Sequence, residues 1–119
     1  MKARDLGRRG ERRAAWFSLL RGFWIVARNR RFRRGEIDLI ARRGKLLVFV
    51  EVKTRQSMAA GEGYEAVDGA KQRQIARLAE EYLAWHPHRG EVRFDVMSLF
   101  WTGRRFVVRH FPDAFMATP

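Results

Sequence analysis

The 119-residue chain has no cysteine, only three prolines and few acidic side chains. Without cysteine, disulfide bonds and thiolate metal sites are excluded. The longest apolar run, Leu46 to Val50, is far shorter than the ~20 residues of a membrane-spanning helix. No charged leader, apolar segment and cleavage site follow one another in signal-peptide order. We therefore expect a cytoplasmic protein that makes no membrane contact.

Positive charge is abundant instead. Lysine and arginine number 25 against 13 aspartates and glutamates, a formal net charge of +12, so nucleic acid is the first partner to consider. The 46% hydrophobic content supports a packed core. A chain of this length is most simply a single domain over residues 1–119, able to bury roughly two-thirds of its unfolded surface.

Hydrophobic periodicity predicts seven elements and an α/β fold, a mixed β-sheet flanked by helices in the order α-β-β-β-α-β-β. The connections are a basic one over 29–35, a hairpin turn over 42–45 and a loop over 56–67 that could serve as a lid. The elements expected are a helix at 3–21 ending at Gly22, strands at 23–27, 36–41 and 46–54, a helix capped by Asp68 and running to Trp85, and strands at 92–101 and 106–110.

Both helices carry an apolar stripe that should face the sheet. The stripes consist of Leu6, Ala14, Phe17 and Leu20 in the first helix, and of Ile75, Leu78, Ala79 and Tyr82 in the second.

Two carboxylates and a lysine interrupt the apolar hairpin, namely Asp38, Glu51 and Lys53. Because side chains alternate across a strand, Glu51 and Lys53 share a face. If Ala41 pairs with Leu46, Asp38 lies opposite Phe49 and diagonal to Glu51, so both carboxylates can reach one cation.

Burying charge without a partner is costly, and a bound cation offsets that cost. Ligands that are all oxygen favour Mg²⁺ or Mn²⁺ over Zn²⁺. Such an ion polarises a scissile phosphate, and Lys53 could orient the attacking water or stabilise developing charge. Glu36 shares the Asp38 face, but it lies at the strand entrance and is the weaker ligand candidate.

Three helical residues are further candidates. Glu11 lies beside the apolar stripe of the first helix and could supply a third acidic group. Lys71 lies one turn before Ile75 on the inward side of the second helix, where it or neighbouring Gln72 could contact a phosphate.

The strings Gly10-Glu11, Gly35-Glu36-Ile37-Asp38-Leu39-Ile40 and Val50-Glu51-Val52-Lys53-Thr54-Arg55, followed by Lys71 and Arg93-Phe94-Asp95-Val96, resemble the YraN-like family of small bacterial proteins. The resemblance covers nearly the whole chain. That family is similar to the restriction-endonuclease-like, or PD-(D/E)xK, nuclease superfamily, which includes Holliday-junction resolvases and RecB-type nucleases.

The resemblance implies a restriction-endonuclease-like core, in which Asp38, Glu51 and Lys53 are catalytic and Glu11 is an auxiliary catalytic ligand. The metal ligands would be Asp38, Glu51 and Glu11. Ile37 stands where the superfamily motif has proline, a departure common in the superfamily.

Structural interpretations remain open beside these. The three hairpin charges could form an ion-pair cluster, although buried salt bridges stabilise inefficiently. Glu11 could neutralise nearby arginines, and Lys71 could extend its ammonium to solvent. For Asp95, alternation places Arg93 on the same face, which favours a structural salt bridge.

Arg30, Arg31, Arg33 and Arg34 surround Phe32 and could be a solvated face. Together with the hairpin charges they favour nucleic-acid binding through backbone contacts, with Arg55, Lys71 and Gln72 as further contacts. We expect a divalent-metal-dependent nuclease acting on DNA, and the resemblance implies branched or processed intermediates. The alternatives are a non-catalytic nucleic-acid-binding module with the same fold and a protein adaptor. A homodimer is expected only if symmetric junctions are cut.

Overall fold

The computed structural model describes residues 2–56 and 68–116. The α/β class and the predicted element order are confirmed. The elements are α1 (Ala3–Leu20), β1 (Trp24–Phe32), β2 (Gly35–Arg43), β3 (Leu46–Arg55), α2 (Gly69–Trp85), β4 (Val92–Trp101) and β5 (Phe106–Phe115). Apart from Gln56, the predicted loop and lid at 56–67 lie outside the described residues.

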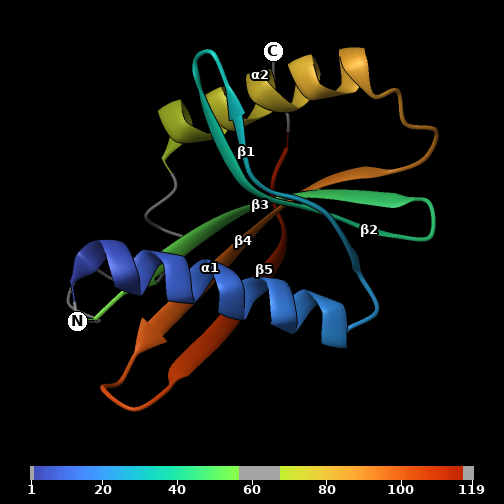
Figure 1. Cartoon of the computed structure of the whole chain (residues 1–119). Coiled ribbons are helices and arrows are strands. Elements are labelled where there is room, and N and C mark those ends of the chain that lie inside the picture. Colours follow the sequence, from blue (N-terminus) through green and yellow to red (C-terminus); the bar gives the residue numbers. More distant parts are fainter. Residues whose placement is uncertain (1, 57–67, 117–119) are drawn as a thin grey trace.

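One five-stranded mixed sheet organises these elements, with its strands in the order β1-β2-β3-β4-β5. The β3–β4 pair is parallel and the other three pairs are antiparallel. The parallel pair is joined through α2, as a crossover connection requires. The two helices cover opposite faces of the sheet (Figure 1).

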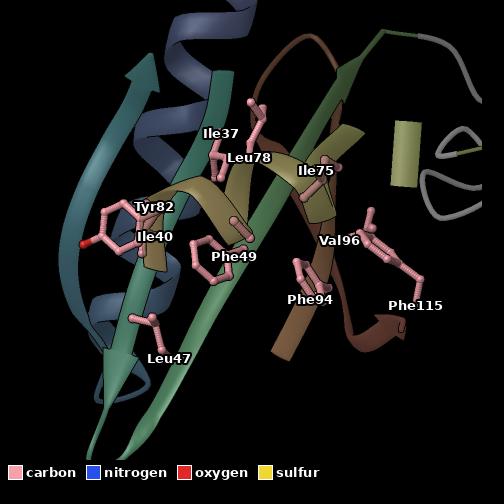
Figure 2. Close-up of a cluster of buried hydrophobic side chains, with 11 residues drawn as sticks. Ile37, Ile40, Leu47, Phe49, Ile75, Leu78, Tyr82, Phe94, Val96 and Phe115 are labelled. Atoms are coloured by element: carbon pink, nitrogen blue, oxygen red, sulfur yellow. The ribbon is translucent and has the colours of Figure 1, made fainter. Parts of the chain in front are cut away.

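Each face of the sheet carries its own apolar core. On the α2 side, Phe49 is fully buried and contacts the rings of Tyr82 and Phe94 (Figure 2). On the α1 side, Val48 and Val50 pack with Ala14. The alternation predicted for β3 is thus confirmed. Since β3 stays in regular register with β4 as far as Arg55, Glu51 and Lys53 follow on the α2 side, where Lys71 lies 3.7 Å from Glu51.

The predicted stripe of α1 is only partly correct. Leu6 and Ala14 are buried, but Phe17 is half-buried and Leu20 is exposed. Apart from Leu6, the buried residues of α1 are small, namely Gly10, Ala14, Ala15 and Ser18. A β-carbon on Gly10 would clash with the Thr54 side chain, so α1 lies unusually close to β3.

The second helix follows the prediction closely. Asp68 is its N-cap, and its side chain accepts a hydrogen bond from the Lys71 amide at 2.9 Å. The buried residues of the helix are those of the predicted stripe, Ile75, Leu78, Ala79 and Tyr82.

The expectation that β1 ends at Ala27 and gives way to a basic connection is wrong. The strand continues to Phe32 and pairs with β2 as far as Gly35, leaving only Arg33 and Arg34 in the turn. An edge strand tolerates arginines because its side chains can stay solvated. Likewise β5 runs to Phe115, beyond the predicted end at His110, since Pro112 is permitted on an edge strand.

The predicted hairpin register is also wrong, by two residues. Arg43 pairs with Leu46 and Ala41 with Val48, so the turn is only Gly44-Lys45. Gly44 has φ +60° there, as a tight hairpin turn requires. A shift of two residues preserves which side chains share a face, and it moves Asp38 from the level of Phe49 to that of Glu51.

Candidate active site

The predicted site lies where β2 and β3 stop pairing. Their regular register runs from Arg43–Leu46 to Leu39–Val50. At the next position the Asp38 side chain takes the role of a backbone acceptor, because its Oδ2 accepts a hydrogen bond from the Val52 amide at 2.8 Å. A carboxylate is therefore held between the two strands.

The regular alternation of β2 is interrupted at the same point. Ile37 and Ile40 both pack in the α2-side core, whereas strict alternation would place them on opposite faces. Across from Asp38 in β1, between the Arg28–Leu39 and Arg30–Ile37 pairs, Asn29 has φ +51°. Asparagine enters this left-handed region more readily than most residues.

Glu51 is the buried member of the site, with 6% of its surface exposed. Burial is the largest cause that raises its pKa, and the charge of Asp38 and a hydrogen bond between the two side chains add to it. Lys71 and Lys53 lower the pKa, but the net result is a value of about 8. The Lys71 Nζ lies 3.7 Å from Glu51 Oε2. Asp38 and Glu51 thus form a close carboxyl pair that strongly favours a nearby positive charge.

A second group of carboxylates adjoins Asp38 from the α1 side. One oxygen from each of Glu11, Glu36 and Asp38 lies within 4.8 Å of the others, and all three side chains are half-buried. Burial raises the pKa of Glu11, and the Asp38 charge raises it further. Asp38 is therefore the residue shared by Glu51 and by the three-carboxylate group. We refer to Glu11, Glu36, Asp38 and Glu51 as the carboxylate site.

Asn29 also belongs to this site, and sequence reasoning missed it. With its amide nitrogen turned toward the acids, it donates to Glu11 Oε1 at 2.9 Å and Glu36 Oε1 at 3.0 Å. The hydrogen bond from Asn29 to Glu11 opposes the rise in the Glu11 pKa but does not cancel it. The asparagine could have been found once β1 was extended to Phe32, because antiparallel pairing then sets it opposite Asp38.

Glu36 is more central than its position at the strand entrance indicated. Besides joining the three-carboxylate group, its Oε2 lies 3.6 Å from Arg31 Nε. This contact links the carboxylate site directly to the β1–β2 arginines.

The four predicted nucleic-acid-binding arginines lie at one end of the β1–β2 hairpin. Arg31, Arg33 and Arg34 are exposed, and Arg30 is half-buried over the Phe32 ring at 5.0 Å. Lys53, Arg55, Lys71 and Gln72 are all half-buried. Two of these side chains reach the carboxylate site, Arg31 at Glu36 and Lys71 at Glu51.

Asp95 lies apart from this site. It is almost fully buried and accepts hydrogen bonds from Arg93 Nε and Nη2, both at 2.8 Å, which confirms the predicted salt bridge. His110 Nε2 lies 2.7 Å from it, and the Asp113 amide donates at 3.0 Å. Burial alone would raise the pKa of Asp95, but these hydrogen bonds bring it below its usual value.

The sequence matches the family model described as "Uncharacterised protein family UPF0102" over residues 10–99. The chain belongs to this family. The YraN-like resemblance is thereby confirmed. The matched range includes every member of the carboxylate site together with Lys53 and Lys71.

Relatives in this family share most of the chain. A UPF0102 protein of Symbiobacterium thermophilum is 57% identical over 98 residues, covering 82% of this chain and 83% of the relative. A UPF0102 protein of Prosthecochloris aestuarii is 43% identical over 120 residues, covering 95% of this chain and 94% of the relative. Among the described residues of our protein, neither helix is long and apolar enough to cross a bilayer.

Proposed function

We propose that this UPF0102 protein is a divalent-metal-dependent endonuclease that hydrolyses phosphodiester bonds, with DNA as its substrate. The observation that carries the proposal is the gathering of carboxylates around Asp38, which lies with Glu11 and Glu36 in a group whose oxygens are within 4.8 Å of one another and which also contacts the buried Glu51. A carboxyl pair held together in the interior destabilises the fold when both groups ionise, so it favours a cation between them.

The donor set fits Mg²⁺ or Mn²⁺. Oxygen atoms of Glu11, Glu36 and Asp38 lie within one cation's reach of one another, and Glu51 contacts Asp38. Hard divalent cations prefer such carboxylate ligands. When bound, the ion would polarise the scissile phosphate and lower the pKa of a water.

The remaining residues would bind and orient the substrate. Lys53 lies on the Glu51 face of β3, where its ammonium can stabilise charge that develops on the phosphate. The arginines of the β1–β2 hairpin can contact the nucleic-acid backbone, and Arg31 connects them to Glu36. Because such contacts read shape and not bases, they support the branched or processed DNA implied by the restriction-endonuclease-like resemblance.

The test is a cleavage panel on single-stranded, duplex, flap and four-way DNA with Mg²⁺, run beside calorimetric measurement of Mg²⁺ binding. Glu51→Gln should reduce cleavage by at least about 100-fold and weaken Mg²⁺ binding while retaining DNA binding. Lys53→Ala should lose cleavage but retain Mg²⁺ affinity, because an ammonium is not a ligand. A parent protein that neither binds Mg²⁺ nor cuts any of the four substrates contradicts the proposal.

One observation favours a second candidate, a nucleic-acid-binding module without catalysis. Lys71 lies within 3.7 Å of Glu51 and could neutralise it in place of a metal ion. In that case DNA binding should weaken with salt by about 0.9 log units in affinity per tenfold salt and per phosphate neutralised, and Lys71→Gln should create no Mg²⁺-dependent cleavage. Binding to a protein that excess DNA cannot displace would instead support the adaptor interpretation.

A further inference from the structure

The outer side of α1 carries a basic and aromatic surface that the proposed active site does not use. The helix has five arginines against two carboxylates, and one of the two, Glu11, is turned toward the carboxylate site. Arg9, Arg12 and Arg13 line an open hollow together with Trp16 and with Phe106 of β5. We call these five residues the α1–β5 surface.

The surface is on the opposite flank of α1 from the carboxylate site. Glu11 lies near Asp38 of β2 and Asn29 of β1, whereas the hollow is lined by Phe106 of β5, at the other edge of the sheet. Figure 1 shows α1 crossing the sheet between these two edges. A ligand on the α1–β5 surface would therefore leave the active site open.

The two aromatic groups differ in exposure, since Trp16 is displayed to solvent and Phe106 packs against the α1-side core at the edge of the hollow. Trp16 is 57% exposed, and Phe106 is half-buried with its ring centroid 4.9 Å from that of Trp101. An indole this exposed on a helix adds nothing to the core, since the helix already buries Ala14, Ala15 and Ser18 on its inner side.

The charges of the surface are not balanced within the described part of the chain. No carboxylate there forms an ion pair with Arg9, Arg12 or Arg13. The β4–β5 turn adds the exposed Arg104 and Arg105 immediately before Phe106. Positive charge beside an exposed indole and a partly exposed phenyl ring complements a strand of phosphates whose bases are unpaired.

From this arrangement we infer that the α1–β5 surface binds single-stranded nucleic acid. The arginines contact successive phosphates and a base stacks on Trp16, with Phe106 completing the hollow. A duplex fits this surface less well, because its bases are already stacked on one another. The inference shares with the proposed function only the class of ligand, and it requires neither the metal nor cleavage.

The experiment measures binding of a dye-labelled oligothymidylate to the full chain by fluorescence anisotropy, in EDTA so that cleavage plays no part. Trp16→Ala should weaken binding by about 5- to 150-fold, the effect of losing one base–aromatic stack. The matched control is Trp85→Ala, which removes a 79%-exposed tryptophan from α2 and should change affinity less than twofold.

A second variant tests the electrostatic part. Replacing Arg9, Arg12 and Arg13 by glutamine should reduce the salt dependence of log affinity by about 2, at about 0.7 per phosphate for a single strand. It should do so even in a protein whose β1–β2 arginines have been replaced.

Two outcomes overturn the inference. Equal affinities for the Trp16→Ala and Trp85→Ala proteins would show that no base stacks on α1. If both α1 variants lose binding to vesicles containing phosphatidylglycerol but keep full affinity for the oligonucleotide, the surface binds anionic lipid. Failure of the parent to cleave DNA would leave the inference standing, because binding is measured without metal.

Discussion

Two buried carboxylates in neighbouring strands of one sheet have opposite surroundings. Asp95 on β4 is enclosed by Arg93, His110 and a backbone amide, and its pKa falls below the usual value. Glu51 on β3 contacts another carboxyl group and has the Lys71 ammonium at 3.7 Å, and although Lys71 and Lys53 lower its pKa, the value rises to about 8. A buried carboxylate whose hydrogen bonds are all satisfied stabilises the folded structure. A buried carboxylate held against another one destabilises it when both are ionised, and a bound cation can remove that electrostatic penalty.

The largest expected effect on stability is at Asp95. Asp95→Ala should lower the free energy of unfolding by about 3–5 kcal/mol, because it leaves the half-buried Arg93 guanidinium and the Asp113 amide without their acceptor. Urea denaturation at pH 7 measures this loss. Glu80→Gln, on the exposed side of α2, should stay within about 0.5 kcal/mol of the parent.

The stability difference between the parent and Asp95→Ala should depend on pH. Since the folded-state pKa of Asp95 lies below its ordinary value of 3.8, the stability it contributes is complete above that value and is lost as the pH falls through the folded pKa. The parent and Asp95→Ala proteins should therefore converge in stability in strong acid. A loss below about 1 kcal/mol at pH 7 would show that the Asp95 cluster is not structural.

Glu51→Gln should have the opposite effect. The raised pKa of Glu51 means that its contribution to stability is complete below the ordinary value of 4.5 and is lost as the pH rises to about 8. In EDTA at pH 8.5, the glutamine should therefore raise the free energy of unfolding, on the order of 1–3 kcal/mol, with a smaller gain at pH 5.5. Urea denaturation at both pH values measures the difference.

Mg²⁺ should reverse that order, because the parent gains binding energy that the variant loses. If Glu51→Gln instead lost about 3–5 kcal/mol at both pH values, and Mg²⁺ stabilised neither protein, Glu51 would be one half of a structural ion pair with Lys71.

The contrast between the two carboxylates was only partly visible in the sequence. Alternation along β3 set Glu51 and Lys53 on one face, and the same rule paired Arg93 with Asp95; both results survive in the structure. The predicted register at Ala41 was wrong by two residues, and a shift by an even number leaves each side chain on its predicted face of the sheet. His110 as a partner of Asp95 could not be foreseen, since strand pairing between β4 and β5 brings them together from 15 residues apart.

The α1 side of the carboxylate site was harder to predict because the strands are irregular there. The rule of alternation assumes a regular strand, whereas β2 changes face near Asp38 and β1 turns left-handed at Asn29. The second half of β1 is rich in arginine and has no apolar alternation, so its sequence does not indicate a strand. Periodicity therefore could not place Asn29 beside the acids or Glu36 within the three-carboxylate group.

The approach of α1 can be tested at Gly10, which precedes Glu11. Gly10→Ala should cost about 1–3 kcal/mol of stability, because the new methyl group meets the Thr54 side chain. It should also weaken Mg²⁺ binding by moving Glu11 away from Asp38. Gly7→Ala is the matched control, since a β-carbon at Gly7 meets no neighbouring atom. Calorimetry and denaturation of both variants separate the two effects, and equal stabilities would contradict the close contact.

The smallest expected effect concerns the left-handed conformation of Asn29. Asn29→Gly removes the amide and also relieves the strain of a β-carbon at φ +51°, whereas Asn29→Ala removes the amide but keeps that strain, roughly 1–2 kcal/mol. The alanine protein should therefore be the less stable of the two by about that amount. Both variants should weaken Mg²⁺ binding to a similar extent, because both remove the amide that bridges Glu11 and Glu36. Denaturation and calorimetry on the pair distinguish a conformational role from a role in holding the two acids. Equal stability of the two variants would mean that the backbone at Asn29 relaxes out of the left-handed region in the alanine protein.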